Sequence, residues 1–187
     1  MDSIENIEQD VGYINKIIQD LQDFARPIKP VTQEIDLLTI CEEILLKSPI
    51  PQNIKASCRI QPETKRLMTD PNALKRIIGN LVVNAVQAMP KGGELTIRAF
   101  TEKGDTTITI QDTGIGIPEE VKKKLFTPLF TTKAKGQGFG LPVVQRMTEA
   151  LGGTVTFEST VGKGTKFIIR LPPPKELNGK FVYKGKR

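Results

Sequence analysis

No run of about 18 apolar residues exists in this sequence, so no part of the chain is expected to cross or contact a membrane. The first ten residues, MDSIENIEQD, are acidic and polar, which is unlike a signal peptide. Only two cysteines occur, Cys41 and Cys58, and they form neither a metal-binding nor a disulfide pattern. These absences favour a protein of a reducing compartment, with a cytoplasmic location.

Histidine is absent altogether, so no reaction of this chain can use an imidazole of its own. A GxxxxGK(S/T) segment is also absent, which excludes a P-loop nucleotide site. The net charge is +6, but five basic residues against Glu176 place +4 of it in residues 173–187. Such a basic tail is typical of a solvated end, and no nucleic-acid-binding motif is visible. Nucleic acid is therefore not an expected partner.

Residues 1–25 repeat apolar side chains at alternating intervals of three and four. The stripe comprises Ile4, Ile7, Val11, Ile14, Ile18, Leu21 and Ala25. This heptad spacing predicts a coiled-coil-like helix that ends near residue 25, because Pro27 disfavours helix in the residue before it. The helix either lies on its own domain or forms a seam in a bundle or dimer, and the strict period favours the seam. A boundary at 27–30 separates this segment, 1–29, from a domain, 30–172. The basic tail, 173–187, follows the domain.

The domain 30–172 mixes short strands with helices. Strands are expected at 31–35, 54–60, 66–68, 94–100, 106–112, 154–159 and 166–171. Helices are expected at 37–46, 70–89 and 140–151. Hairpins mixed with helices predict an α+β fold: a two-layer α/β sandwich in which helices cover one face of a mixed sheet.

The expected helix 70–89 carries polar residues one turn apart, at the edge of its apolar stripe. Asp70 is a good N-cap, and the predicted buried residues are Leu74, Ile78, Leu81, Ala85 and Ala88. Asn80, Asn84 and Gln87 follow a second stripe about 110° away. A solvated flank would explain them, but asparagine is a poor helix former. The alternative is a set of amide groups aimed into a cleft, where their oxygens suit Mg²⁺ that is otherwise held by water and phosphates.

Two glycine segments frame a long irregular stretch. DTGIG (112–116) follows the strand 106–112, and GQGFG (136–140) opens the helix 140–151, where N–H groups can hold phosphate. Asp-Thr-Gly is also the signature of an aspartic protease, which would need a second aspartate from another chain to share a proton. The order of an asparagine-bearing helix, DxGxG, a long lid and GxG at a helix start favours a nucleotide pocket.

Four segments in this order carry a family resemblance: NLVVNAVQAM, DTGIGI, LFTPLFTTK and GQGFGL. They resemble the N box, first glycine box, F box and second glycine box of the sensor histidine kinase ATP-binding domain, in the gyrase, chaperone, mismatch-repair and histidine kinase (GHKL) group of ATPases. GTVTFESTVGKGTKFIIRLP is similar to that family's closing hairpin, so the match covers residues 30–172. The segment 1–29, with its DFARP ending, resembles the second helix of the family's dimerisation hairpin. The resemblance implies a Bergerat-type ATP-binding fold preceded by an incomplete hairpin.

The resemblance also implies roles for matching residues. Asp112 would accept a hydrogen bond from the adenine amino group, Asn84 would bind Mg²⁺, and Asn80 and Lys133 would act in catalysis at the phosphate end. Phe126 and Phe130 would pack and hinge the lid. The implied ATP contacts are Asn80, Asn84, Gln87, Asp112, Gly114, Gly116, Phe126, Phe130, Thr131, Thr132, Lys133, Gly138, Phe139, Gly140, Leu141 and Thr165, the last near adenine and often through water.

The implied function is to bind Mg-ATP and donate its γ-phosphoryl group to a histidine that this chain lacks, for relay to a response-regulator aspartate. The parent protein would form a homodimer through the helix 1–25. Gln87 stands where some relatives have a basic residue, which leaves one phosphate contact without its usual side chain. Asn80 stands where ATP-hydrolysing members of the group place a glutamate that activates water, so net hydrolysis should be slow.

Two other functions stay open from the sequence. One is a non-enzymatic, nucleotide-binding regulatory module; the remote one is an aspartic protease that uses Asp112-Thr113-Gly114. The stretch 118–137 is expected to be a mobile lid, because loops of that length are uncommon unless functional. Within it, Lys122, Lys123 and Lys124 are expected to form a solvated helix face.

Overall fold

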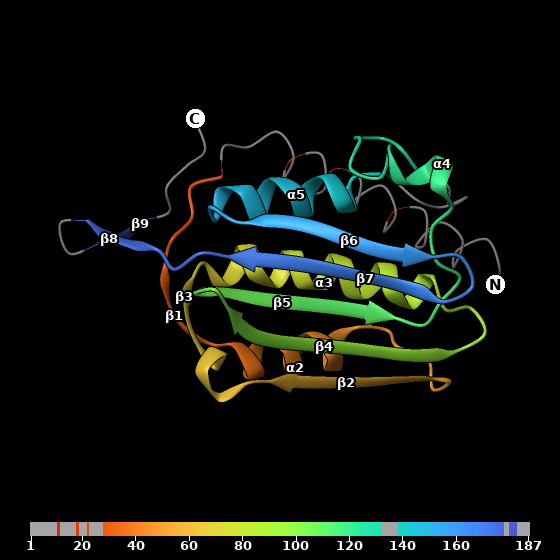
Figure 1. Ribbon diagram of the computed structural model, residues 1–187, viewed down its shortest axis with the longest axis horizontal. Coiled ribbons are helices and arrows are strands. Elements are labelled where there is room, and N and C mark those ends of the chain that lie inside the picture. Colours follow the sequence, from red (N-terminus) through yellow and green to blue (C-terminus); the bar gives the residue numbers. More distant parts are fainter. Residues whose placement is uncertain are drawn as a thin grey trace.

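A five-stranded mixed sheet with helices on one face forms the body of the protein, shown as a computed structural model in Figure 1. The structure describes residues 28–131, 138–177 and 180–182, together with Val11, Ile18 and Gln22. The strand order is β2-β4-β5-β7-β6, with β2 (Ile54–Ile60) parallel to β4 (Gly93–Glu102) and every other pair antiparallel. The other strands are β5 (Asp105–Asp112), β6 (Thr154–Thr160) and β7 (Gly164–Leu171). The predicted α+β fold is confirmed.

Helices α2 (Leu37–Lys47), α3 (Pro71–Gln87) and α5 (Gly140–Ala150) all lie behind the sheet in the view of Figure 1. The buried stripe of α3 is wider than the sequence predicts: it comprises Ala73, Leu74, Ile77, Ile78, Leu81, Val82 and Ala85. The reason is that α3 packs against α2 and α5 as well as the sheet, so more than one of its sides is covered. Asn80 and Asn84 lie at the edge of this stripe, half-buried, as expected.

Several short elements complete the described part of the chain. Most of them are too short for a periodic pattern in the sequence to predict them. The strands β1 (Gln33–Asp36) and β3 (Arg66–Thr69), which pair, are expected, whereas the 3-10 turn η1 (Pro62–Thr64) is not. The single-turn helix α4 (Glu119–Lys122) includes only the first of the three lysines that are expected on a helix face. The tail 173–187, expected to be only a solvated end, contains a hairpin of β8 (Lys175–Leu177) and β9 (Lys180–Val182), which projects beyond the sheet in Figure 1. Within the described ranges, no helix has the length and apolar character needed to cross a bilayer.

The predicted helix 1–25 falls almost entirely outside the described residues. Val11, Ile18 and Gln22 are described, and all three are helical. The prediction of a coiled-coil-like seam therefore stays a prediction.

Strand register arranges the inner face of the sheet in rows. One row runs through Ala99, Ile108, Ile169 and Val155, and the next through Ile97, Ile110, Phe167 and Phe157. Because side chains alternate between the faces of a strand, both rows face the helices and form the core. The following row, at the right-hand end of the sheet in Figure 1, begins with the apolar Leu95 on β4. Its other members are polar register partners, Asp112 on β5, Thr165 on β7 and Ser159 on β6, and we call these three the polar row.

The cysteines lie on facing elements, Cys41 on α2 and Cys58 on β2, and both are free thiols. A hydrogen bond from the buried Cys41 thiol lowers the pKa of Cys58. The same hydrogen bond, together with burial, raises the pKa of Cys41. Cys58 is therefore the thiol of the pair that ionises first.

Asp70 joins the start of α3 to the first residues of the domain 30–172. Its Oδ1 accepts hydrogen bonds from Asn72 N at 2.8 Å and Ala73 N at 2.9 Å, which makes it the predicted N-cap. Its Oδ2 accepts a hydrogen bond from Val31 N at 2.7 Å, across 39 residues of sequence. One buried carboxylate thus both begins the helix and anchors the chain that enters the domain.

We expect Asp70→Ala to lower the free energy of unfolding by about 2 kcal/mol, because the helix loses its cap and Val31 N loses its acceptor. Urea denaturation of the two proteins measures the difference. The matched control is Asp36→Ala, which removes the half-buried N-cap of α2, its bond to Thr39 N at 3.0 Å and its ion pair with Lys65 at 3.7 Å. It should cost less, because these contacts are more exposed to solvent. Equal losses in the two variants would contradict the anchoring role of Asp70.

Candidate functional site

The candidate site lies where the polar row of the sheet faces the C-terminal part of α3. A cavity of about 340 Å³ opens there, within the range of small-molecule sites. It is lined by Asn84, Gln87, Ala88, Asp112, Ile115, Gly116, Ile117, Pro118, Val121, Leu125, Leu141, Thr165 and Phe167. Asn84, Gln87, Asp112, Gly116, Leu141 and Thr165 are residues that the sequence analysis selects.

The other selected residues that the structure describes do not line this cavity. They are Asn80, Gly114, Phe126, Phe130, Thr131, Gly138, Phe139 and Gly140. Thr132 and Lys133 lie outside the described residues. The cavity wall also contains apolar residues that the sequence analysis does not select, among them Ile115, Val121 and Phe167.

Asp112 is held in one orientation at the end of β5. The residue is 3% exposed. Its Oδ1 accepts hydrogen bonds from Gly114 N at 2.9 Å and from Thr165 N at 3.2 Å. A carboxylate has about four acceptor positions, so these two bonds orient the group and still allow it to accept a hydrogen bond from a ligand.

The glycines after Asp112 are required by the protein's own backbone. A Cβ at Gly114 would lie 2.3 Å from Ala88 O, and one at Gly116 would lie 2.2 Å from Thr160 O. The loop is closed on both sides, since Ile115 N donates to Ala88 O and Gly162 N donates to Ile115 O, each at 2.9 Å. Gly116 also has a φ of +71°, which side chains rarely adopt. The loop is therefore clamped between the end of α3 and the turn after β6.

Asn80 and Asn84 differ in their surroundings. Asn84 lines the cavity, together with the exposed Gln87 one turn further along α3. Asn80 lies deeper, and its Nδ2 is buried without a hydrogen-bond partner among the described residues. A Cβ placed on Gly140 would lie 3.6 Å from Asn80 Oδ1, so this amide sits beside the first turn of α5.

The first turn of α5 offers backbone donors. No side chain of the described residues caps this helix, whose N-cap position is held by the buried Phe139. The first N–H groups of an α-helix have no partners within the helix, and its N-terminus favours negative charge. The oxygen side of the Asn80 amide therefore lies beside the uncapped donors at the start of α5.

The lid begins as an ordered stem. Lys122 Nζ donates to Ser159 O at 2.8 Å and pairs with Glu119. The prediction of a solvated lysine face is therefore wrong for Lys122, whose side chain is 22% exposed, because a single helical turn packs against β6 instead of presenting one wet face. Lys123 and Lys124 are exposed, as expected.

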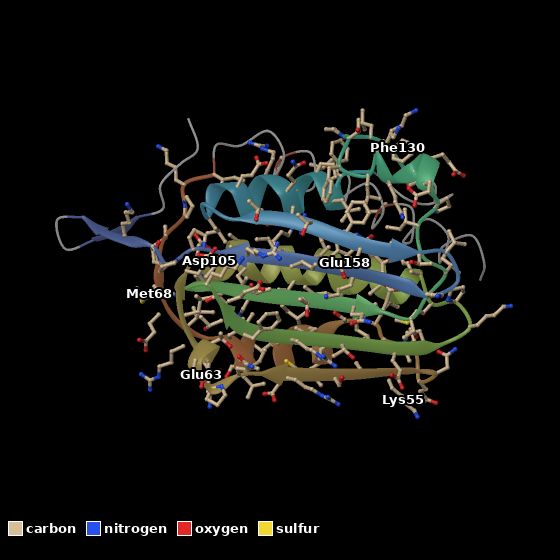
Figure 2. The ribbon with its side chains drawn as sticks, viewed as in Figure 1. Lys55, Glu63, Met68, Asp105, Phe130 and Glu158 are labelled. Carbon is tan, nitrogen blue, oxygen red and sulfur yellow. The ribbon has the colours of Figure 1, made fainter. Side chains whose placement is uncertain are left out.

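Aromatic rings join the stem to the cavity. The ring of Phe126 lies 6.1 Å from that of Phe157 on β6, which lies 5.9 Å from that of Phe167 in the cavity wall. Phe130 lies beside α4 (Figure 2) and is half-buried, whereas Thr131 is exposed. Phe126 thus packs as the sequence analysis expects, although it does not reach the cavity.

The two ends of the stretch after the stem meet at a narrow neck. Leu129 N donates to Gly138 O at 3.1 Å. Both residues have positive φ, and a Cβ at Gly138 would lie 2.5 Å from Leu129 C. Residues 118–131 are tied to β6 and to this neck, and the prediction of a mobile lid over 118–137 stays a prediction.

Ser159 is the polar residue that the sequence analysis misses. Its hydroxyl accepts a hydrogen bond from Ile117 N at 2.9 Å and lies 2.9 Å from Thr165 Oγ1. The alternation of β6 offers a signal for it: Val155, Phe157 and Ser159 share the inward face, so the hydroxyl had to point towards the site.

Comparisons with known proteins agree with one another. The family described as histidine kinase-, DNA gyrase B-, and HSP90-like ATPase matches residues 69–175. The sensor histidine kinase ZraS of Klebsiella oxytoca is 35% identical over 164 residues, which cover 85% of this chain and 35% of the relative. AtoS of Escherichia coli K12, a signal transduction histidine-protein kinase, is 33% identical over 88% of this chain and 28% of its own length. The chain thus spans about a third of the length of the curated relatives it matches.

Among solved structures, the nucleotide-free catalytic domain of histidine kinase ThkA has a TM-score of 0.67 and 30% identity, over 75% of this chain and 95% of that domain. In both sequence and fold, this chain is therefore similar to the catalytic domain of a histidine kinase.

Proposed function

The chain belongs to the family of histidine kinase-, DNA gyrase B- and HSP90-like ATPases, and on that premise we propose that it is the ATP-binding catalytic part of a two-component sensor histidine kinase. The observation that carries the proposal is the composition of one cavity. Its wall combines the acceptors Asp112 and Thr165 from the sheet, the amides Asn84 and Gln87 from α3, and several apolar residues. A purine nucleotide has the matching parts: a base with polar edges and apolar faces, and anionic phosphates.

The base end of the proposed site is formed by Asp112 and Thr165. Asp112 accepts a hydrogen bond from the adenine amino group, and Thr165 stands beside it in the next strand. The apolar side chains of Ile115, Val121 and Phe167 provide surfaces for the faces of the ring. Burial of the ring among them excludes water and strengthens the polar contacts at its edge.

The phosphate end is formed by α3 and the start of α5. The buried Asn80 Nδ2 is a donor without a protein partner in the described part of the chain, which suits a phosphate oxygen. The amide oxygen of Asn84 suits Mg²⁺, which keeps several waters and takes its other ligands from phosphates. The described residues contain no cluster of three acidic or cysteine side chains, so this donor set fits a metal that arrives with the nucleotide. When bound, Mg²⁺ neutralises phosphate charge. Lys133 remains a proposed lid contact.

The proposed reaction moves the γ-phosphoryl group to a histidine that lies outside this sequence. A bond forms between an imidazole nitrogen and phosphorus, the bond from phosphorus to the bridging oxygen breaks, and ADP leaves. The residues of this chain orient the nucleotide and stabilise its charge, which is most of the catalysis in phosphoryl transfer. Asn80 cannot act as a general base for water, so hydrolysis should be slow compared with transfer. A homodimer through residues 1–25 and relay to a response-regulator aspartate complete the proposal.

The experiment that tests this function is transfer in trans. The protein is mixed with radiolabelled Mg-ATP and a second chain in which a first hairpin helix, with its histidine, is joined to residues 1–29. We expect acid-labile label on the added chain and none on this chain alone, because the sequence has no histidine. A reaction with excess chelator is the control.

The missing histidine favours one alternative: that this chain acts only as a nucleotide-binding module. Nucleotide binding without transfer to the added hairpin would favour it. Absence of both binding and transfer would refute the proposed site.

A further inference from the structure

We propose that Ser159 sets the direction of the Thr165 hydroxyl and thereby helps the site to select a purine with a 6-amino group over one with a 6-oxo group. The inference rests on the proposed function and deepens it, since it concerns the base end of the same site. Ser159 lies on β6, directly opposite Thr165 on β7, and does not line the cavity itself. It is a positioning residue that would act through Thr165.

Counting protons gives this network two arrangements. The Ser159 hydroxyl has one proton and two acceptor positions. It accepts from Ile117 N at 2.9 Å, and it can donate either to Gly164 O at 3.1 Å or to Thr165 Oγ1 at 2.9 Å. In the proposed arrangement the proton goes to Gly164 O, a carbonyl that can only accept, so the Thr165 hydroxyl donates to Ser159 and its proton points away from the cavity.

The consequence is that Thr165 presents oxygen lone pairs to the base. Among the residues that the structure describes, Ser159 is the one hydrogen-bond partner of the Thr165 hydroxyl. Asp112, the next residue in the row, is an acceptor as well. Two acceptors side by side match an amino group, which donates, and oppose a carbonyl oxygen, which also accepts. A water between Thr165 and the base preserves this order, because it accepts from the amino group and donates to Thr165.

Ser159 also has a structural role, and a test must separate this role from its effect on the direction of the Thr165 hydroxyl. Through Ile117 N and through its own carbonyl, which accepts from Lys122 Nζ, it ties the glycine loop and the lid stem to β6. Its neighbour Glu158 lies on the open face of the sheet (Figure 2), paired with Lys166. Loss of Ser159 could therefore weaken binding of every nucleotide by loosening the loop. Only the ratio of two affinities reports the direction of the Thr165 hydroxyl.

The experiment measures the dissociation constants of ATP and of ITP, its 6-oxo counterpart, by calorimetry with Mg²⁺. In Ser159→Ala the Thr165 proton is released and can turn towards a 6-oxo group. We expect the preference for ATP over ITP to fall about tenfold, the effect of one mismatched buried hydrogen bond, while Asp112 keeps part of it. Ser159→Thr, which retains a hydroxyl, should keep the preference. Thr160→Ala, on the exposed side of the same strand, should leave it unchanged.

The outcomes separate the two proposals. A wild-type protein that binds neither nucleotide would refute the proposed function. A wild-type protein that prefers ATP, with the same preference in Ser159→Ala, would overturn the role of Ser159 alone. If Ser159→Ala weakens the binding of ATP and of ITP by the same factor, Ser159 has only a structural role. If Ser159→Ala does not fold, Ser159→Cys replaces it in the test, because a cysteine is similar in size to serine and its thiol forms only weak hydrogen bonds.

Discussion

Asn84→Ala is expected to reduce phosphoryl transfer to the added hairpin by about 10²–10³-fold, the usual loss when one preorganised charge-stabilising contact is removed. Asn84 lines the cavity from α3 and offers the amide oxygen that suits Mg²⁺. Without it, the metal would lose its protein ligand at the phosphate end. The measurement is the initial rate of acid-labile labelling with radiolabelled Mg-ATP.

The matched control for this prediction is Asn72→Ala. Asn72 lies on the same helix, is exposed, and contributes its backbone N–H to the network while its side chain faces solvent. A magnesium titration adds a second readout, since loss of a ligand should raise the metal concentration that half-maximal transfer requires. Transfer that is undiminished in Asn84→Ala, with an unchanged magnesium requirement, would place the metal elsewhere.

Asp112→Asn is expected to weaken ATP binding by about ten- to a hundredfold, because one buried acceptor is replaced by a donor. The two N–H donors of Gly114 and Thr165 both address Oδ1. If the amide oxygen of the new side chain keeps those bonds, its NH₂ faces the adenine amino group, donor against donor. The reverse orientation places that NH₂ against two backbone donors, so both arrangements lose a hydrogen bond.

Calorimetry on both proteins measures this change. Asp105→Asn is the control, since it makes the same chemical change at the opposite end of β5 (Figure 2), and Asp105 does not line the cavity. Thermal unfolding of each variant shows whether the fold is retained. An affinity for ATP that matches the wild type would remove Asp112 from the base contact.

Much of the fold is predictable from local signals. The strand predicted at 54–60 has the bounds of β2, and Asp70 caps α3 as expected. The order of the motifs also predicts the cavity, because Asn84, Asp112 and Thr165 do line it. The short elements are less predictable, since α4 spans four residues and β8 and β9 three each, too few for a period to show.

The neighbours of each site residue are harder to predict. Thr165 N reaches Asp112 across 53 residues of sequence, and Val31 N reaches Asp70 across 39. Nothing local to Ser159 indicates that its hydroxyl meets Thr165 and Ile117, because that depends on the register of β6 and β7 and on where the glycine loop crosses them. Lys122 shows the same limit: its place in a run of lysines predicts exposure, but its partner is a carbonyl of β6.

By itself, the sequence determined the types of the elements, the cap of α3 and the identity of several polar groups that line the cavity. These properties depend on side-chain chemistry and on periodicity over a few residues. Only the tertiary structure decided which groups share the polar row, which amide of α3 lines the cavity and which lies beside α5, and that Cys41 contacts Cys58. The physical reason is that contacts between distant residues are set by strand register and by the packing of all the elements together. A shift of one residue in register would turn Ser159 or Thr165 to the opposite face of the sheet.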